Sequence, residues 1–167
     1  MILSRAELLS SLKHEVHILQ HLASKVDRTK LDYRPTPKQR STLELFQYLS
    51  MMGPSLFDVA KAAKFDPPAW TALERAAFAR DFDQTLAAIA EQPALYEKAL
   101  GDISDADMRV EISPFGQPSS RGAFLVNLVL CGCAAYRTQL FCYLKACGRD
   151  ELSTINLWAG MDAPVRQ

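Results

Sequence analysis

The feature that most constrains the fold is a long apolar stretch near the end of the chain, from Ala123 to Gly148. Its sequence, AFLVNLVLCGCAAYRTQLFCYLKACG, predicts the last long helix of a helical bundle. Because the stretch is apolar nearly all round, we expect other helices to cover it on several sides. One face is apolar at one end and polar-aromatic in its middle, and we expect it to line any pocket: Leu125, Val129, Gly132, Tyr136, Gln139 and Tyr143.

The length and charge of the chain limit its class and its partners. With 167 residues we expect a single domain, residues 1–167, with a substantial core. The chain has 19 basic and 19 acidic residues, so we expect neither nucleic acid nor a membrane surface as a partner. The longest apolar run, Ala123 to Tyr136, is shorter than the about 20 residues of a membrane-spanning helix. The amino-terminal segment lacks the uninterrupted apolar core of a signal peptide.

The four cysteines all lie in the predicted last helix, at positions 131, 133, 142 and 147. Helix positions two apart point in different directions, so Cys131 and Cys133 are not expected to form a disulfide. The pattern is typical of a reducing cytoplasm, where cysteine serves as a small buried hydrophobic residue. We therefore expect a cytoplasmic protein in which Cys147 is the most exposed thiol. A zinc site fits poorly, because there is no CxxC pair and no histidine nearby.

Three earlier segments place apolar residues at helical spacing and predict three more helices. They run from Ser4 to about Val26, from Ser41 to about Phe65, and from Asp81 to Leu100. In the first two, a glutamate follows the initial serine by three residues, which is the capping-box arrangement. Gly53-Pro54 predicts a kink or a break in the second. With the last helix, these segments predict an all-α four-helix bundle.

The connections after the second helix are expected to be irregular. Residues 67–79 are interpreted as a surface connection with one irregular turn. Residues 108–117 look extended and form a short segment before the last helix. Ser119 or Ser120 is expected to cap that helix, and Gly148 to end it. The tail that follows is too apolar to stay free, so we expect it to pack back on the bundle.

All three histidines lie on one face of the first predicted helix: His14, His17 and His21. This face lies roughly opposite the buried stripe of the helix. His17 and His21 are one turn apart and are candidates for adventitious surface metal binding. We favour a solvated or dimer-facing polar stripe, because a functional metal site normally adds ligands from another element. A pH-sensitive dimer contact is a further alternative.

Three segments carry motifs in a recognisable order. Residues 32–45, DYRPTPKQRSTLEL, precede and open the second helix. Residues 103–108, ISDADM, are followed by Phe115-Gly116, and the last helix contains YRTQL and then Tyr143-Leu144 and Gly148. In order and spacing these segments resemble the DinB-like (DinB/YfiT) family of four-helix bundles, over most of the chain. The chain is identified as a divergent member of that family.

The resemblance implies a metal site that this chain has lost. Family members typically hold a divalent metal with three histidines, one from helix two and two from helix four. Those positions fall here on Tyr48, Gly132 and Tyr136. Glycine has no side chain for a metal, and tyrosines with pKa values near 10 are poor substitutes for imidazole. We therefore expect no metal and no other cofactor at this place.

The space between Tyr48 and Tyr136 leaves two interpretations open. The tyrosines plug the former site, or they line an apolar cleft for a small apolar or aromatic ligand. In both, Met52, Gln139 and Tyr143 are expected to line the pocket, with Gln139 as a hydrogen-bond partner of Tyr136.

The functional hypotheses follow from this altered site. The first is a metal-free DinB-like homodimer in small-molecule binding or in a structural or stress-related role. The second, which the resemblance implies, is an S-transferase or isomerase that uses a low-molecular-weight thiol in the same pocket. The third is a dimer regulated through the histidine face of the first helix. The residues do not decide whether the protein is an enzyme.

Overall fold

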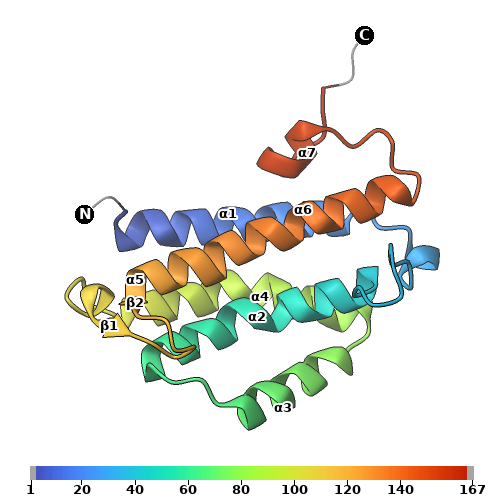
Figure 1. The fold of residues 1–167 in the computed structure, drawn as a ribbon. Coiled ribbons are helices and arrows are strands. Elements are labelled where there is room, and N and C mark those ends of the chain that lie inside the picture. The colour runs from blue at the N-terminus through green and yellow to red at the C-terminus, as the bar shows by residue number, and fades with distance from the viewer. Residues whose placement is uncertain (1–2, 165–167) are drawn as a thin grey trace.

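Four long helices form the body of the molecule (Figure 1), in a computed structural model that describes residues 3–164. They are α1 (Arg5–Ala23), α2 (Thr42–Ala62), α4 (Phe82–Gly101) and a continuous last helix, Arg121–Ala146, made of α5 (Arg121–Phe124), the π-helical segment η3 (Leu125–Leu130) and α6 (Cys131–Ala146). Each helix contributes fully buried side chains to one core, among them Leu12, Leu45, Ile89 and Val129. The predicted all-α four-helix bundle is confirmed.

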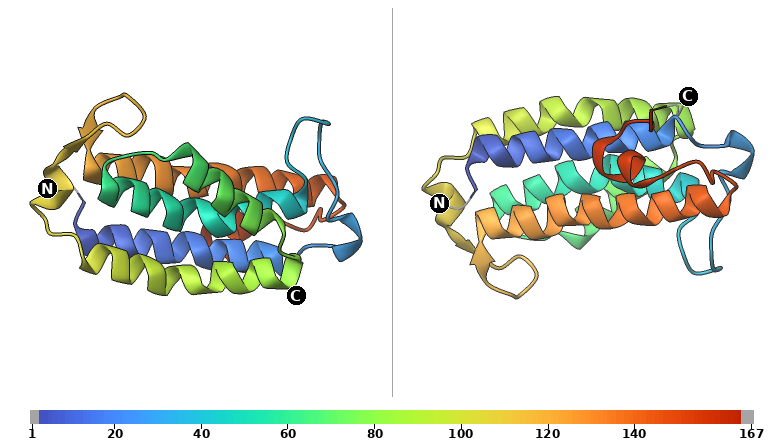
Figure 2. Two further views of the ribbon diagram at one scale, coloured as in Figure 1. Left: turned by 90° about the horizontal axis from the view of Figure 1, so that it is seen from below. Right: turned by 90° about the horizontal axis from the view of Figure 1, so that it is seen from above.

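The connection between α2 and α4 is a helix, α3 (Pro67–Phe78), so the irregular turn predicted there is wrong. α2 and α4 lie side by side and run in the same direction, so the chain must return along the bundle between them (Figures 1 and 2). α3 makes this return outside α2. Asp66 caps it by accepting from the Ala69 amide, and Pro67 occupies its first position. Hydrophobic periodicity did not reveal α3, because Ala77 is its one buried residue.

The Gly53-Pro54 pair does not break α2, which is one continuous helix. Gly53 lies against Tyr96 of α4, and a Cβ added at Gly53 would lie 1.9 Å from the tyrosine hydroxyl oxygen. The buried Gln92 donates a hydrogen bond from Nε2 to the backbone oxygen of Leu49, at 2.8 Å. Packing against α4 therefore supports α2 where proline weakens its own hydrogen bonding.

The short extended segment predicted before the last helix is present. β1 (Glu111–Ile112) pairs antiparallel with β2 (Ser119–Ser120), and Glu111 lies opposite Ser120. Ser120 then caps α5 by accepting from the amide of Ala123. At the other end of this helix, Gly148 has the left-handed φ of +94° expected of a terminating residue. Two 3₁₀ turns, η1 (Arg28–Lys30) and η2 (Asp107–Arg109), complete the connections.

The last helix is less covered than its sequence predicted, since only 33% of its most apolar window is buried. By length and composition it could cross a membrane, which corrects the prediction that its apolar run is too short; core helices of soluble proteins meet the same criterion. Its thiols differ accordingly. Cys133 is buried, and burial raises the pKa of its thiol to about 12. Cys131 and Cys142 are exposed, so their expected burial is wrong. Cys147 is half-buried, so the expectation that it is the most exposed thiol is wrong as well.

The tail packs back on the bundle as expected, through α7 (Thr154–Ala159). Figure 2 shows α7 lying over the groove between α1 and α6. It covers the histidine face of α1: His14 Nε2 lies 2.8 Å from the backbone oxygen of Trp158, and His21 Nε2 lies 3.0 Å from Asn156 Nδ2. The prediction of a solvated stripe therefore holds at His14 and His17, which are exposed, and is wrong at His21, which α7 partly buries.

A buried ion pair links α1 to α6. Arg137 Nε lies 2.9 Å from a carboxylate oxygen of Glu15, and the two side chains are only 4% and 10% exposed. The Arg137 guanidinium also donates to the backbone oxygen of Leu157 and lies 5.1 Å from the ring centroid of Trp158. Arg137 is buried because α7 covers it.

Candidate functional site

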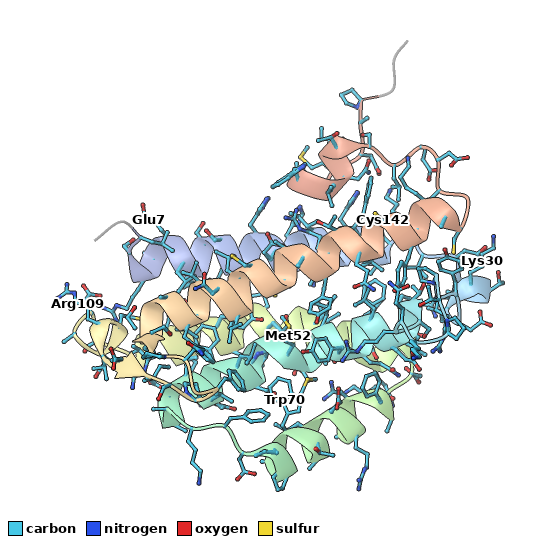
Figure 3. All side chains as sticks on the ribbon, viewed as in Figure 1. Glu7, Lys30, Met52, Trp70, Arg109 and Cys142 are labelled. Carbon is cyan, nitrogen blue, oxygen red and sulfur yellow. The ribbon has the colours of Figure 1, made fainter. Side chains whose placement is uncertain are left out.

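An apolar cavity of about 520 Å³ lies between α2, the start of α3 and the last helix. α2 contributes Tyr48 and Met52, and the last helix contributes Gly132 and Tyr136. Trp70 of α3 also lines the cavity, and Figure 3 shows its side chain between α3 and α2. The cavity therefore lies where the sequence placed the altered site of the family.

Tyr48 and Tyr136 meet across the two helices, with ring centroids 5.3 Å apart and planes at 73°. This edge-to-face arrangement is favourable for aromatic rings. A Cβ added at Gly132 would lie 3.3 Å from the methyl group of Met52, so the glycine leaves room for the methionine tip. The pair narrows the space between α2 and the last helix, but both rings lie on the cavity wall and the cavity beside them remains.

The Tyr48 ring also contacts a cationic side chain, that of Arg40. The Arg40 guanidinium carbon lies 3.9 Å from the centroid of the Tyr48 ring, and Arg40 Nη2 lies 3.5 Å from a carboxylate oxygen of Glu74 on α3. Burial and, to a lesser extent, the neighbouring Tyr136 raise the pKa of Tyr48 to about 12, and Arg40 opposes the shift. At neutral pH the Tyr48 phenol therefore keeps its proton and is a hydrogen-bond donor.

Gln139 and Tyr143 hold the Arg40 backbone. The Gln139 amide donates to the Tyr143 hydroxyl, which in turn donates to the backbone oxygen of Arg40 at 3.1 Å. Gln139 thus bonds to Tyr143 and not to Tyr136, the partner expected from its spacing. Tyr143 is buried, and it does not line the apolar cavity.

A second, polar cavity of about 700 Å³ has Arg40 in its wall. Its wall includes Gln139 and five charged side chains: Arg34, Lys38, Arg40, Glu44 and Glu74. Sequence reasoning identified none of these charged residues as site residues. Arg40 lies in the loop before the N-cap of α2, where helical periodicity says nothing about side-chain position.

Aromatic side chains at the rim of the apolar cavity were also missed. Phe65 lies between Trp70 and Phe115, with centroid distances of 5.6 Å and 4.8 Å. The π-helical turn of the last helix adds Asn127 and Leu128 to the wall. Such turns often occur at functional sites. These residues come from a loop and from an irregular turn, so no periodic pattern pointed to them.

The residues at the family's ligand positions do not fit a metal. Tyr48 stays protonated at neutral pH and Gly132 offers no donor, so Tyr136 would remain as one phenol. Over residues 3–164, no group of three histidine, cysteine or carboxylate side chains is placed to hold a metal ion, and this includes His14, His17 and His21. The chemistry that this site offers is apolar contact with a few hydrogen-bonding and cationic groups.

The fold is similar to that of a solved bundle protein. Neither a protein-family model nor the sequence of a curated protein matches the chain. The crystal structure of a DinB-like protein, YjoA, from Bacillus subtilis superposes with a TM-score of 0.67 at 18% sequence identity. The match covers 88% of this chain and 95% of that chain. This chain has the DinB-like fold. The match confirms the fold that the sequence resemblance implied.

Proposed function

We propose that this DinB-like bundle binds a small apolar or aromatic molecule in the cavity between α2, α3 and the last helix. The observation that carries the proposal is the open cavity beside the tyrosine pair. Its volume of about 520 Å³ lies within the range of small-molecule sites, and apolar and aromatic side chains form most of its wall.

The few polar groups on this wall suit orientation of a ligand. Tyr48 and Tyr136 make no hydrogen bond to a backbone, carboxylate or amide group in the described part of the chain. The two phenols hydrogen-bond to each other, and a ligand can bond to the lone pairs and the proton that this single bond leaves over. The side-chain amide of Asn127 also lines the cavity. Phe65 and Trp70 offer ring faces on which a flat ligand can stack.

Titration with a neutral aromatic dye, N-phenyl-1-naphthylamine, tests the proposal. We expect saturable fluorescence enhancement with the unchanged protein and about tenfold weaker binding in Ala135→Trp, whose new ring enters the cavity. Ala146→Trp is the matched control, because Ala146 is exposed on the same helix and is not a lining residue. Equal affinity in both variants, or no binding to the unchanged protein, would contradict the proposal.

The other functional hypotheses stay predictions. Cys131 lies on the cavity wall, but a thiol-dependent transferase needs a bound thiol substrate that no contact here identifies. The homodimer and the cytoplasmic localisation also remain expectations from the sequence.

A further inference from the structure

We propose that the ligand of this cavity is an organic anion whose charged end binds Arg40. The proposal rests on the proposed function, because it places the apolar body of the same ligand in the cavity between α2, α3 and the last helix. It adds the chemical class: an aromatic or aliphatic acid rather than a neutral molecule.

Arg40 lies at the boundary between the two cavities. Tyr48 lines the apolar cavity, Arg40 lines the polar one, and the guanidinium carbon of Arg40 lies 3.9 Å from the centroid of the Tyr48 ring. A molecule that passes the edge of the Tyr48 ring therefore contacts apolar surface with one part and a guanidinium with the other. A planar guanidinium matches the two oxygens of a carboxylate.

The present partner of Arg40 is replaceable. Glu74 lies 3.5 Å from Arg40 Nη2, no hydrogen bond joins these side chains, and they are 31% and 35% exposed. An ion pair of this length and exposure contributes little, so an incoming carboxylate displaces Glu74 at small cost. Arg34, in contrast, is 3.2 Å from Glu44, which also accepts from the Ser41 amide that begins α2. Arg34 is therefore committed to the structure of the loop.

The position and charge of Arg40 are prepared for a ligand. The Tyr143 hydroxyl holds its backbone oxygen, and the Tyr48 ring holds its guanidinium, so little side-chain freedom remains to be lost on binding. The polar cavity brings together three cations, Arg34, Lys38 and Arg40, against two carboxylates, which leaves one excess positive charge.

Two dyes with the same aromatic body test the inference. N-phenyl-1-naphthylamine is neutral, and 8-anilino-1-naphthalenesulfonate adds one anionic group. We expect the unchanged protein to bind the sulfonate about tenfold more tightly at low salt, with the advantage shrinking as salt is added. Arg40→Gln is expected to remove this preference while binding of the neutral dye stays within about twofold. Arg75→Gln is the matched control and should keep the preference, because Arg75 is exposed on α3 and lines neither cavity.

A second variant separates loss of the site from loss of the fold. Glu74→Gln frees Arg40 from its acidic neighbour, so we expect it to strengthen sulfonate binding, a gain that misfolding would not produce. If the unchanged protein does not bind the neutral dye, the proposed function fails. If the neutral dye binds but the sulfonate has no advantage, or the advantage survives Arg40→Gln, the anion inference alone is overturned.

Discussion

Single residues decide how closely the helices approach, and two glycines show this most clearly. Gly53 faces the phenol of Tyr96, with 1.9 Å between an added Cβ and the hydroxyl oxygen, whereas Gly132 faces the flexible end of Met52 at 3.3 Å. Tyr96 is fully buried and has little room to move. The methionine tip can shift within the cavity beside it.

We therefore predict opposite tolerance at these two positions. Gly53→Ala should lower the free energy of unfolding by about 1–3 kcal/mol, because the added methyl forces Tyr96 away from α2. Gly132→Ala should change it by less than about 0.5 kcal/mol, since the gain in helix propensity offsets a small adjustment of Met52. Urea unfolding followed by circular dichroism measures both. Equal effects would show that α2 and α4 are not held as closely as the structure has them.

The sequence predicted residue positions well where a helix repeats and poorly where it does not. Tyr48 and Tyr136 were expected to lie together because the family resemblance places both at positions that converge from two long helices. Arg40 lies only a few residues before Tyr48, yet its position over the ring depends on a hydrogen bond from Tyr143, which is 103 positions away in the sequence. No local pattern contains that information.

At the scale of elements, two short helices determine what the long ones expose. α3 carries Trp70 to the apolar cavity and, one turn later, Glu74 to Arg40, so the site depends on the return connection between α2 and α4. α7 contacts His14 and partly buries His21 of α1. Both helices have few buried side chains, which is why hydrophobic periodicity revealed neither.

The docking of α7 should depend on pH through His21. Burial lowers the pKa of His21 below its ordinary value of 6.5; Lys25 and His17 add to this, and Asp162 opposes it. Undocked His21 then binds a proton more readily than docked His21. The stabilisation is complete above about pH 6.5 and is lost as the pH falls through the lowered pKa. Asn156 contributes because it donates to the neutral ring nitrogen, which protonation removes as an acceptor.

Hydrogen exchange at residues 154–160, corrected for intrinsic rates, measures this release. We expect faster exchange at about pH 5 than at about pH 7.5. His21→Gln should exchange at one rate at both pH values, because glutamine keeps an acceptor without titrating. His14→Gln should keep the pH dependence, since it leaves the contact between His21 and Asn156 in place. Release that persisted in His21→Gln would assign it to another group.

At the scale of the whole molecule, the four long helices were predictable because their caps and apolar stripes agree. Ser4 with Glu7 and Ser41 with Glu44 form the capping boxes expected, and both mark the starts of helices in the structure. The arrangement of those helices was not derivable from local signals. α2 and α4 run parallel, and only the packed bundle shows that the chain segment connecting them must return along the bundle. The cavity is a consequence of that arrangement.

The central claim is that a small molecule binds beside Tyr48 and Tyr136, and methyl NMR of methionine-labelled protein tests it most directly. The chain has five methionines. Met52 lines the apolar cavity, Met108 lines a separate cavity, and Met161 is exposed near α7. On addition of N-phenyl-1-naphthylamine, we predict that the Met52 methyl resonance shifts saturably in step with dye fluorescence while Met108 and Met161 stay unchanged. A dye that binds without moving Met52, or that moves Met108 instead, would contradict the account.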